Sequence, residues 1–363
     1  MQDRLLSLDI FRGMTIFFMI IVNTPGSWSN VYAPLLHAKW DGLTPTDLVF
    51  PFFVFIVGVA MSISFNKYHG ENRGAWIKKV LKRTTLIFLV GLALNWFPFY
   101  NKSIHDLRIF GVLQRIALAY GFASLIVIFF QKRWIPFIFS FILIIYYIIL
   151  LAFGGDDPLS LEGNASGALD LWLIGENHVY GGYGIPFDPE GLLSTLPTIG
   201  TVLFGYWVGK VIQAGDGVMG KMKALIPYAV GGILLGIGLN FLGCPINKPI
   251  WSSSYVLLTG GLASLSLIIL LWVLDYKKWT GWTYIFRAFG KNPLISYVLS
   301  GVFIRIFGMI RIEDKGLYSW LYENVFSQII SLKFGSFTQA LVYVLFIWLF
   351  AWWMYRKDIV VKL

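Results

Sequence analysis

Long apolar stretches constrain the fold of this chain more than any other feature. Ten of them are each long enough to cross a hydrocarbon core of about 30 Å as a helix that rises about 1.5 Å per residue. They lie at residues 7–24, 46–65, 84–100, 110–130, 134–153, 191–209, 224–242, 252–273, 291–310 and 337–355. We therefore expect an all-α, polytopic integral membrane protein with about ten transmembrane helices. Residues 1–363 are expected to form one transmembrane domain without a separate soluble domain.

The composition supports this fold class. Hydrophobic residues make up 57% of the chain and charged residues 13%, and the mean hydropathy is +0.70. These values are too apolar for a soluble protein of this length and fit a helical membrane protein. The aromatic content of 18% suits belts of aromatic side chains at both membrane interfaces. The single cysteine, Cys244, excludes an internal disulfide and a multi-thiolate metal site, so we expect a packing residue there and no bound metal.

The distribution of charge predicts the orientation of the chain. With both termini in the cytoplasm, 20 of the 29 Lys and Arg residues lie inside, whereas the loop at residues 154–190, which has seven acidic residues and no Lys or Arg, lies outside. The excess of basic residues behind the net charge of +10 is then explained mostly by the orientation of the chain in the membrane, and it does not indicate a nucleic-acid partner. We expect a multi-pass protein of the cell (inner) membrane. Residues 315–333 are expected to form a surface helix or a re-entrant piece.

Residues 37–47 place ionisable groups at the edge of an apolar stretch. This block reads HAKWDGLTPTD, and the imidazole of His37 is expected on the outer side of the membrane. Ionisable groups at the edge of hydrocarbon are costly, so a functional site is the first hypothesis there. The alternative is an interfacial anchor in which Trp40 marks the headgroup level. A catalytic role is favoured for His37 because its charge can change near neutral pH.

Further polar motifs lie where other apolar stretches begin. They read Arg108-Ile-Phe-Gly-Val-Leu-Gln-Arg115, Asp188-Pro-Glu-Gly191, Asn247-Lys248-Pro-Ile-Trp-Ser-Ser253 and Gly290-Lys-Asn-Pro293. Each motif can simply mark the start or end of a helix, because Asp, Asn and Ser cap helices whereas Pro and Gly interrupt them. Arg115 does not fit that interpretation, since a guanidinium inside a membrane helix needs an anionic partner or a wet cavity.

Taken together and in this order, the motifs resemble those of the heparan-α-glucosaminide N-acetyltransferase family of transmembrane acyltransferases. The matching stretches are Asp9–Gly13, Val22-Asn23, His37–Asp47, Phe50–Phe55, Arg108 to Arg115, Asp188–Gly191, Asn247-Lys248, Trp251-Ser252 and Tyr355–Lys357. The resemblance runs from about residue 3 to the C-terminus and is that of a bacterial-type member. Lysosomal members carry an extra luminal domain and one more span ahead of the matching region, which leaves the acceptor substrate open.

The resemblance implies that an acetyl group moves from cytosolic acetyl-CoA to the amine of a terminal glucosamine, heparan-type or a related amino sugar, on the outer side. The family's catalytic His and a nearby Asn match His37 and Asn23. A neutral imidazole suits the removal of the amine proton, and the Asn23 carboxamide can stabilise the oxyanion. Asp47 can hold the His37 ring in one tautomer or cap the second apolar helix. Direct transfer and an acetyl-histidine intermediate both remain open.

Coenzyme A carries phosphates and therefore needs cations at the cytoplasmic side. The candidates are Arg83, Lys357 and Lys362, with Arg115 deeper in the membrane, although basic residues inside are also simply what the positive-inside rule predicts. The candidate substrate-binding residues are Trp40, Asp188, Glu190, Asn247 and Lys248. The expected partners are acetyl-CoA, the glycan acceptor, the lipid bilayer and a second copy of the chain in a homodimer, without nucleic acid. The alternative function is a transporter of an anionic or sugar substrate, but the block at residues 37–47 has no counterpart in the second half.

Overall fold

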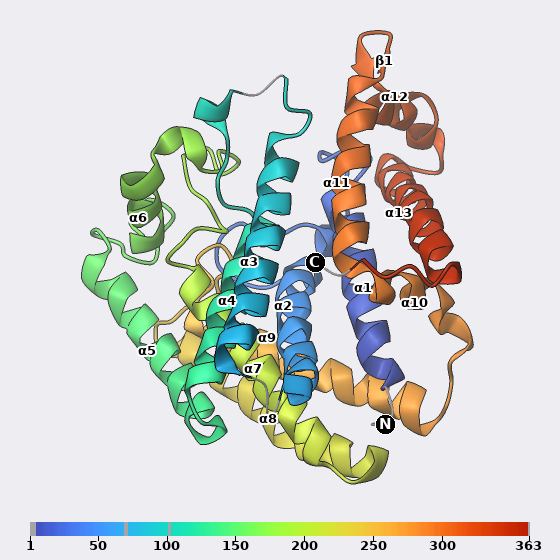
Figure 1. The fold of residues 1–363 in the computed structure, drawn as a ribbon. Coiled ribbons are helices and arrows are strands. Elements are labelled where there is room, and N and C mark those ends of the chain that lie inside the picture. Colours follow the sequence, from blue (N-terminus) through green and yellow to red (C-terminus); the bar gives the residue numbers. More distant parts are fainter. Residues whose placement is uncertain (1–4, 69–71, 101–102, 362–363) are drawn as a thin grey trace. The chain divides into compact units, whose positions relative to one another are not determined.

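The structure, a computed structural model, describes residues 5–68, 72–100 and 103–361. It is all-α apart from one short hairpin (Figure 1). The helices are α1 (Leu6–Asn23), α2 (Pro45–Ser64), α3 (Arg73–Trp96), α4 (Val112–Phe129), α5 (Ile135–Phe153), α6 (Ala165–Ile174), α7 (Thr195–Ala214), α8 (Gly217–Phe241), α9 (Ser253–Leu270), α10 (Tyr284–Lys291), α11 (Pro293–Met309), α12 (Leu317–Asn324) and α13 (Leu332–Arg356). The antiparallel hairpin consists of β1 (Arg311–Ile312) and β2 (Lys315–Gly316).

The membrane class is confirmed by the length and apolarity of the helices. In the described part of the chain, seven helical segments are long and apolar enough to cross a membrane, or up to eight if a bent pair counts as one span. The seven are Leu6–Asn23, Pro45–Ser64, Val112–Phe129, Lys132–Phe153, Gly217–Phe241, Ser253–Tyr276 and Leu332–Arg356. The bent pair joins Gly281–Lys291 to Pro293–Met309 at 81°. Each of the ten expected stretches overlaps a helix, but a total near ten crossings and a cytoplasmic position of both termini remain predictions.

The boundaries of several elements differ from those expected. Helix α3 begins at Arg73 rather than near residue 84, because the Asn72 side chain caps it by accepting a hydrogen bond from the Gly74 amide (2.9 Å). The loop at residues 154–190 contains α6, which Asn164 caps in the same way. A run this short lies below the length of a membrane span. Within residues 315–333 the structure places α12, in agreement with the helix expected there.

The chain divides into two compact units, which are described separately. The terminal unit contains residues 1–38, 44–53 and 273–362, and the central unit contains residues 39–43 and 54–272. In the terminal unit, α1 packs against α10, α11 and α13, so the first and last helices lie together (Figure 1). Gly13 makes this close packing possible, because a Cβ atom there would lie 1.9 Å from the carbonyl oxygen of Phe286 in α10.

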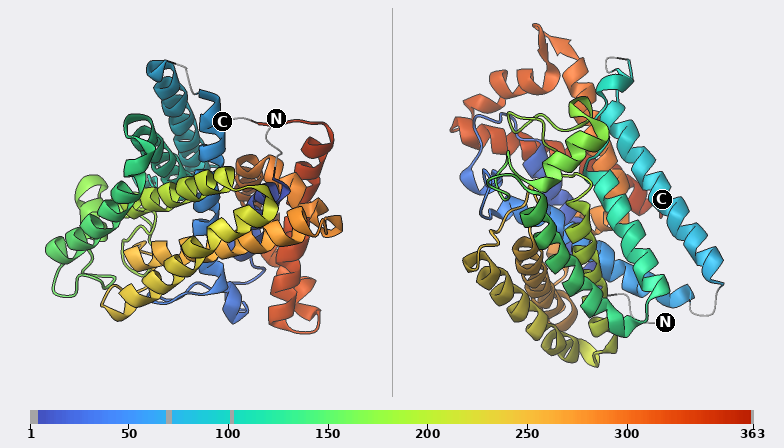
Figure 2. Two further views of the ribbon diagram at one scale, coloured as in Figure 1. Left: turned by 90° about the horizontal axis from the view of Figure 1, so that it is seen from below. Right: turned by 90° about the vertical axis from the view of Figure 1, so that its left-hand side faces the viewer.

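In the central unit, α7 packs against α4, α5, α8 and α9. Helices α8 and α9 run side by side, as Figure 2 shows in yellow and orange. Their backbones approach closely where Gly232 faces Gly261, since a Cβ atom at Gly232 would lie 2.8 Å from the Gly261 Cα. Small residues at helix contacts are typical of membrane bundles, in which close backbone packing replaces the hydrophobic effect as the source of stability.

Candidate functional site

His37 and Asp47 form a hydrogen-bonded pair in the terminal unit. The Nδ1 atom of His37 lies 2.6 Å from Oδ1 of Asp47. The His37 side chain is 45% exposed, whereas that of Asp47 is 1% exposed. An ionised carboxylate only accepts hydrogen bonds, so this contact places the ring proton on Nδ1. In that tautomer Nε2 is the basic ring nitrogen, and solvent can reach the ring.

The second carboxylate oxygen of Asp47 holds the turn at the start of α2. Its Oδ2 accepts hydrogen bonds from the amide of Ala38 (3.0 Å) and from the amide and hydroxyl of Thr44 (3.1 and 3.0 Å). An acidic residue in the first helical turn that reaches back to the preceding amide is the arrangement of a capping box. Pro45 begins the helix, where its missing N–H costs nothing. Asp47 therefore contacts the imidazole with one oxygen and caps the helix with the other, which joins the two roles that the sequence left as alternatives.

Asn23, the second candidate catalytic residue, is the last residue of α1 and belongs to the same unit as His37. Its side chain is exposed. The helix ends there because the chain turns at Thr24, whose hydroxyl donates to the Ile20 carbonyl (2.8 Å). The carbonyl of Thr24 in turn accepts a hydrogen bond from the hydroxyl of Tyr318 (2.7 Å). These contacts fix the end of α1, and the part of Asn23 in catalysis stays a prediction.

Residues 39–43 of the same sequence block belong to the central unit, where Trp40 is held by protein contacts. Its indole Nε1 donates to the Leu159 carbonyl (2.9 Å), and its ring packs edge-on against Phe187 and Tyr183. Phe187 is part of a buried apolar cluster with Tyr146, Leu150, Ala165 and Ile250. The segment is thus anchored by side-chain packing within the protein.

Asn247, together with the residue before it, forms hydrogen bonds that hold the next residues of this segment, Asp41 and Gly42, in place. Its carboxamide donates to Oδ1 of Asp41 (3.0 Å) and accepts from the Ile250 amide (2.9 Å), and it is fully buried. The Gly42 amide also donates to the Ile246 carbonyl (2.7 Å). Asn247 therefore uses its polar atoms inside the protein, whereas the adjacent Lys248 is half-buried. A substrate contact by either residue stays a prediction.

Asp188 and Glu190, expected to bind substrate, are both paired with Arg108. The guanidinium makes a bidentate contact with Asp188 (2.8 and 2.7 Å) and a third hydrogen bond to Glu190 (2.6 Å). It also lies over the ring of Tyr180, 4.7 Å from the centroid. Burial alone would lower the pKa of Arg108, but the hydrogen bonds and charges of the two carboxylates outweigh it and raise that pKa. The motif that begins with Arg108 is thus joined to the motif that begins with Asp188.

Asp170 is a buried carboxylate that the sequence did not single out. It lies in α6, where its Oδ1 accepts a hydrogen bond from the Leu192 amide (2.9 Å). Its Oδ2 has no partner among the described residues and lies so close to Gly191 that a Cβ atom there would be 1.7 Å away. Burial raises the pKa of Asp170 to about 7. The only signal in the sequence is an acidic residue in the middle of an otherwise apolar run.

Arg115 is buried in the central unit with neutral partners. Its Nη2 donates to the hydroxyl of Ser194 and to the Gly191 carbonyl (3.4 Å), and its guanidinium lies over the ring of Trp251, 5.1 Å from the centroid. The charges of Glu190, Asp188 and Asp170 act on it electrostatically. The Nε atom has no partner in the described part of the chain. Among the described residues, therefore, carboxylates act on Arg115 through their charge, but none forms an ion pair with it.

The remaining candidate cations for coenzyme A lie on different parts of the chain. Arg83 is exposed on α3 of the central unit, with its guanidinium 4.8 Å from the ring centroid of Tyr120. Lys357 is exposed at the end of α13 in the terminal unit. Lys362 lies outside the described residues. A shared role in phosphate binding stays a prediction for all of them.

The single cysteine and the potential metal ligands are the remaining groups that could carry chemistry. Cys244 is buried, and its thiol donates to the hydroxyl of Ser254 (3.7 Å), which fits the packing role expected for it. Within residues 5–68, 72–100 and 103–361, no group of three or more His, Cys, Asp or Glu side chains could hold a metal ion.

Comparison with known proteins places the chain in a family. Residues 4–242 match the family model described as heparan-alpha-glucosaminide N-acetyltransferase, catalytic. The chain is 28% identical over 353 residues to the heparan-alpha-glucosaminide N-acetyltransferase of Mus musculus, a match that covers 82% of this chain and 53% of that protein. The protein of the same name from Homo sapiens is 28% identical over 367 residues, which cover 85% of this chain and 54% of that one. The chain thus spans about half the length of these relatives.

Proposed function

Because the chain belongs to the heparan-α-glucosaminide N-acetyltransferase family, we propose that it transfers an acetyl group from acetyl-CoA to the amine of a terminal glucosamine or a related amino sugar. The observation that carries this proposal is the contact between His37 and Asp47, in which a buried carboxylate holds Nδ1 of an imidazole whose side chain is 45% exposed. A base of this kind is what the reaction needs. An amino sugar must lose a proton as its nitrogen attacks the thioester carbonyl.

In the proposed reaction the amine nitrogen forms a bond to the carbonyl carbon, and Nε2 of His37 accepts the proton that the nitrogen loses. The tetrahedral intermediate then collapses with cleavage of the carbon–sulfur bond. The imidazolium returns its proton to the leaving coenzyme A sulfur, so His37 ends the cycle neutral. The Asn23 carboxamide is proposed as a donor to the oxyanion, a role typically worth about 3 kcal/mol.

Asp47 is proposed as a positioning residue in this reaction. It is 1% exposed and is fixed by three hydrogen bonds to its Oδ2, so it can hold the His37 ring with little freedom. Its negative charge also stabilises the imidazolium that forms during proton transfer. Because Asp47 lies in the first turn of α2, the helix dipole stabilises that charge in return.

We further propose that acetyl-CoA enters from the cytosol and that the acceptor binds on the outer side of the cell (inner) membrane. The basic residues proposed to hold the phosphates are Arg83, Arg115, Lys357 and Lys362. Arg83 and Lys357 are exposed and so accessible to a phosphate, whereas Arg115 is buried and would have to be reached through a channel. Direct transfer requires only the base. Transfer through an acetyl-histidine requires Nε2 to attack the thioester first.

The experiment that tests the proposal is an acetyl-transfer assay on purified protein with radiolabelled acetyl-CoA and glucosamine. The wild type should label the acceptor, and His37→Ala should lower the rate at least 100-fold while acetyl-CoA binding persists. A matched control is His105→Ala, because His105 is an exposed histidine that also lies beside a carboxylate, Asp106 (3.2 Å). Equal turnover by the wild type and His37→Ala would refute the catalytic assignment.

The same assay separates the two routes of transfer. If His37 becomes acetylated, the protein should retain label after rapid denaturation of a reaction without acceptor. Direct transfer predicts that no label is retained under those conditions. The His37→Ala protein serves as the blank for both measurements.

A further inference from the structure

Lys210 is a half-buried lysine of the central unit whose direct contacts are all neutral. It lies in the last turns of α7, directly after the apolar stretch at residues 191–209. Its ammonium group donates to Oδ1 of Asn66 (2.6 Å) and lies 5.5 Å from the ring centroid of Tyr206. Within the described residues no carboxylate lies at ion-pair distance from it. An ammonium group has three N–H donors, so two remain for water or a ligand.

A chain of side-chain hydrogen bonds holds the Asn66 oxygen against Lys210. The Gln213 carboxamide donates to the Ser62 hydroxyl (2.8 Å) and to the Gly209 carbonyl (2.9 Å), and its oxygen accepts from the Asn66 amide. Asn66 must therefore present its own oxygen to Lys210. Helices α2 and α7 pack closely at this point, since a Cβ atom at Gly209 would lie 2.1 Å from the Ser62 hydroxyl oxygen. The fold thus fixes the ammonium group, whereas a lysine kept only for the orientation of the chain can extend freely into water.

A second cation lies near Lys210. The charge of Lys132, in the turn that precedes α5, acts on Lys210 electrostatically. Lys132 is exposed and belongs to the same unit, and the described part of the chain supplies it with no carboxylate either. Two neighbouring ammonium groups repel each other when no carboxylate offsets their charge. An anion bound between them would be stabilised by both.

The predicted side of the membrane indicates which anion this is. The charge distribution of the sequence predicts that Lys132 and Lys210 lie on the cytoplasmic side. Phosphate esters are the anions that dominate there, both in dissolved metabolites and in the headgroups of anionic lipids. Lysine binds phosphate as a point charge, and one phosphate group has enough oxygens to accept from two lysines.

We propose that Lys210 and Lys132 form a phosphate-binding site at the cytoplasmic end of the central unit, with Lys210 held in place by Asn66. The ligand is a phosphate ester, supplied by a soluble molecule such as coenzyme A or by the headgroup of an anionic lipid. The inference does not depend on acetyl transfer, because phosphate binding at this site and catalysis at His37 are measured separately.

Two experiments distinguish the sources of the phosphate. In the first, calorimetry measures the affinity for coenzyme A and for 3′-dephospho-coenzyme A, with the protein in nanodiscs of phosphatidylcholine. In the second, the melting temperature is measured in nanodiscs of phosphatidylcholine with and without phosphatidylglycerol. Both are performed on the wild type and on each variant.

Four variants alter the site in different ways. Lys210→Gln removes the fixed charge and Lys210→Arg keeps it. Asn66→Asp places a carboxylate of the same shape beside Lys210, where it competes with a phosphate for the ammonium group. Lys132→Gln removes the second charge at an exposed position, where the fold depends little on the side chain.

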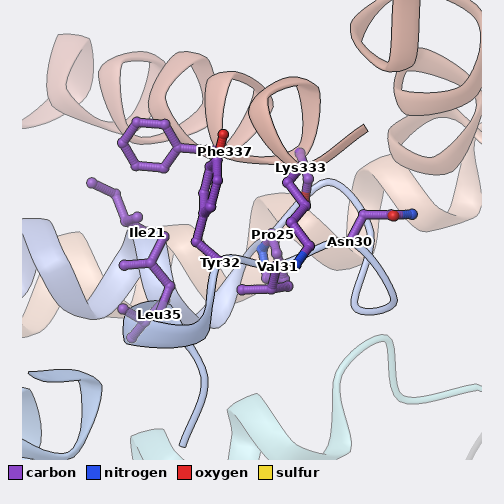
Figure 3. A pocket seen from close by; sticks show the side chains of 11 residues that line it. Ile21, Pro25, Asn30, Val31, Tyr32, Leu35, Lys333 and Phe337 are labelled. Carbon is purple, nitrogen blue, oxygen red and sulfur yellow. The ribbon is translucent and has the colours of Figure 1, made fainter. Parts of the chain in front are cut away.

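Lys333→Gln is the matched control, because it removes a lysine of the other unit. Figure 3 shows Lys333 on α13, near Tyr32 and Phe337, beside a hollow that has room for only about one water molecule. A phosphate ester does not fit there. Loss of this charge should therefore leave both measurements as in the wild type.

Lys210→Gln and Asn66→Asp should bind coenzyme A at least about tenfold more weakly than the wild type, or should lose most of the rise in melting temperature that phosphatidylglycerol causes. Lys132→Gln should show a smaller loss in the same experiment, and Lys210→Arg should retain most of the response. A loss in the first experiment assigns the site to a soluble ester, and a loss in the second assigns it to a lipid headgroup. A loss for coenzyme A but not for its dephospho form identifies the 3′-phosphate as the bound group.

Wild-type responses of folded Lys210→Gln in both experiments would overturn the site, as would an equal loss in Lys333→Gln. If Lys210→Gln does not fold, Asn66→Asp and Lys132→Gln decide, and wild-type behaviour of either one in both experiments would again overturn the proposal. A response that depends on Lys210 without any acetyl transfer leaves the phosphate site standing and refutes only the proposed function.

Discussion

Substitution of Asp47 by Asn is the most direct test of the catalytic geometry. The two side chains have the same shape, so the change removes the charge with little loss of volume. In the structure the Asp47 carboxylate accepts hydrogen bonds from His37, from the Ala38 amide and from the amide and hydroxyl of Thr44. An asparagine can accept at only one of its two side-chain positions. The contact to the imidazole or the contacts to the turn must therefore be lost.

The expected loss of activity follows from the contact to His37. A hydrogen bond to a charged group contributes about 1.5–3 kcal/mol, which corresponds to about 10- to 150-fold at 1.36 kcal/mol per tenfold change. An amide N–H facing Nδ1 would also favour the tautomer with the proton on Nε2, in which the base is blocked. Loss of the buried aspartate in the Ser-His-Asp triad costs about 10⁴-fold for this reason. We therefore expect Asp47→Asn to lower kcat/KM by about 10- to 10⁴-fold.

The assay is acetyl transfer to glucosamine over a range of pH, with the melting temperature measured on the same samples. Thr44→Ala is the matched control, since it removes the hydroxyl contacts to Asp47 and to the Leu36 carbonyl (2.7 Å) and keeps the carboxylate that contacts His37. In the background of His37→Ala, the substitution of Asp47 should have no further effect on rate, because it acts through the imidazole. An Asp47→Asn protein with a rate within threefold of the wild type would refute this reasoning.

Three further predictions concern topology, cofactor binding and pH. In a protein without its native cysteine, a new cysteine at residues 154–190 should react with an impermeant thiol reagent on intact cells, whereas one at residues 66–83 should not, and the reverse pattern would invert the orientation. Acetyl-CoA binding, measured by calorimetry, should weaken about tenfold in Arg83→Gln, in Arg115→Gln and at high salt, and unchanged affinity in all three would exclude these phosphate contacts. Because burial raises the pKa of Asp170 to about 7, its contribution should make the protein less stable as pH rises from about 4 to 7. Asp170→Asn should remove that slope from the melting temperature, and an identical slope in both proteins would contradict the assignment.

The sequence predicts the helical framework well because membrane spans have a strong local signal. Each expected stretch overlaps a helix, since apolar length alone determines where such helices form. Apolar length fails to predict a helix, or the start of one, where the helical residues are charged or where the apolar run is short. The first turns of α3 are rich in basic residues, so the apolar stretch begins well after Arg73. The apolar run of α6 is too short to stand out within a loop.

The contacts within the candidate site are less predictable, because they depend on how distant segments meet. The pairing of His37 with Asp47 is local, and the sequence already allowed it as one of two roles for the carboxylate. The pairing of Arg108 with Asp188 joins residues 80 positions apart, and no periodicity within either motif reveals it. The unpartnered oxygen of Asp170 likewise results from the approach of Gly191, which lies in another segment.

The distribution of satisfied and accessible polar groups bears on where an acceptor can bind. In the central unit, Asp188 is fully buried and both of its oxygens contact Arg108, which leaves little capacity for a sugar amine. In the terminal unit, the His37 side chain remains accessible to solvent. A buried charge that is already paired gains little from a ligand, whereas an accessible one can exchange water for a substrate group. Acceptor recognition is therefore better supported in the terminal unit, and Asp188 and Glu190 of the central unit are better explained as the ion-pair partners of the half-buried Arg108.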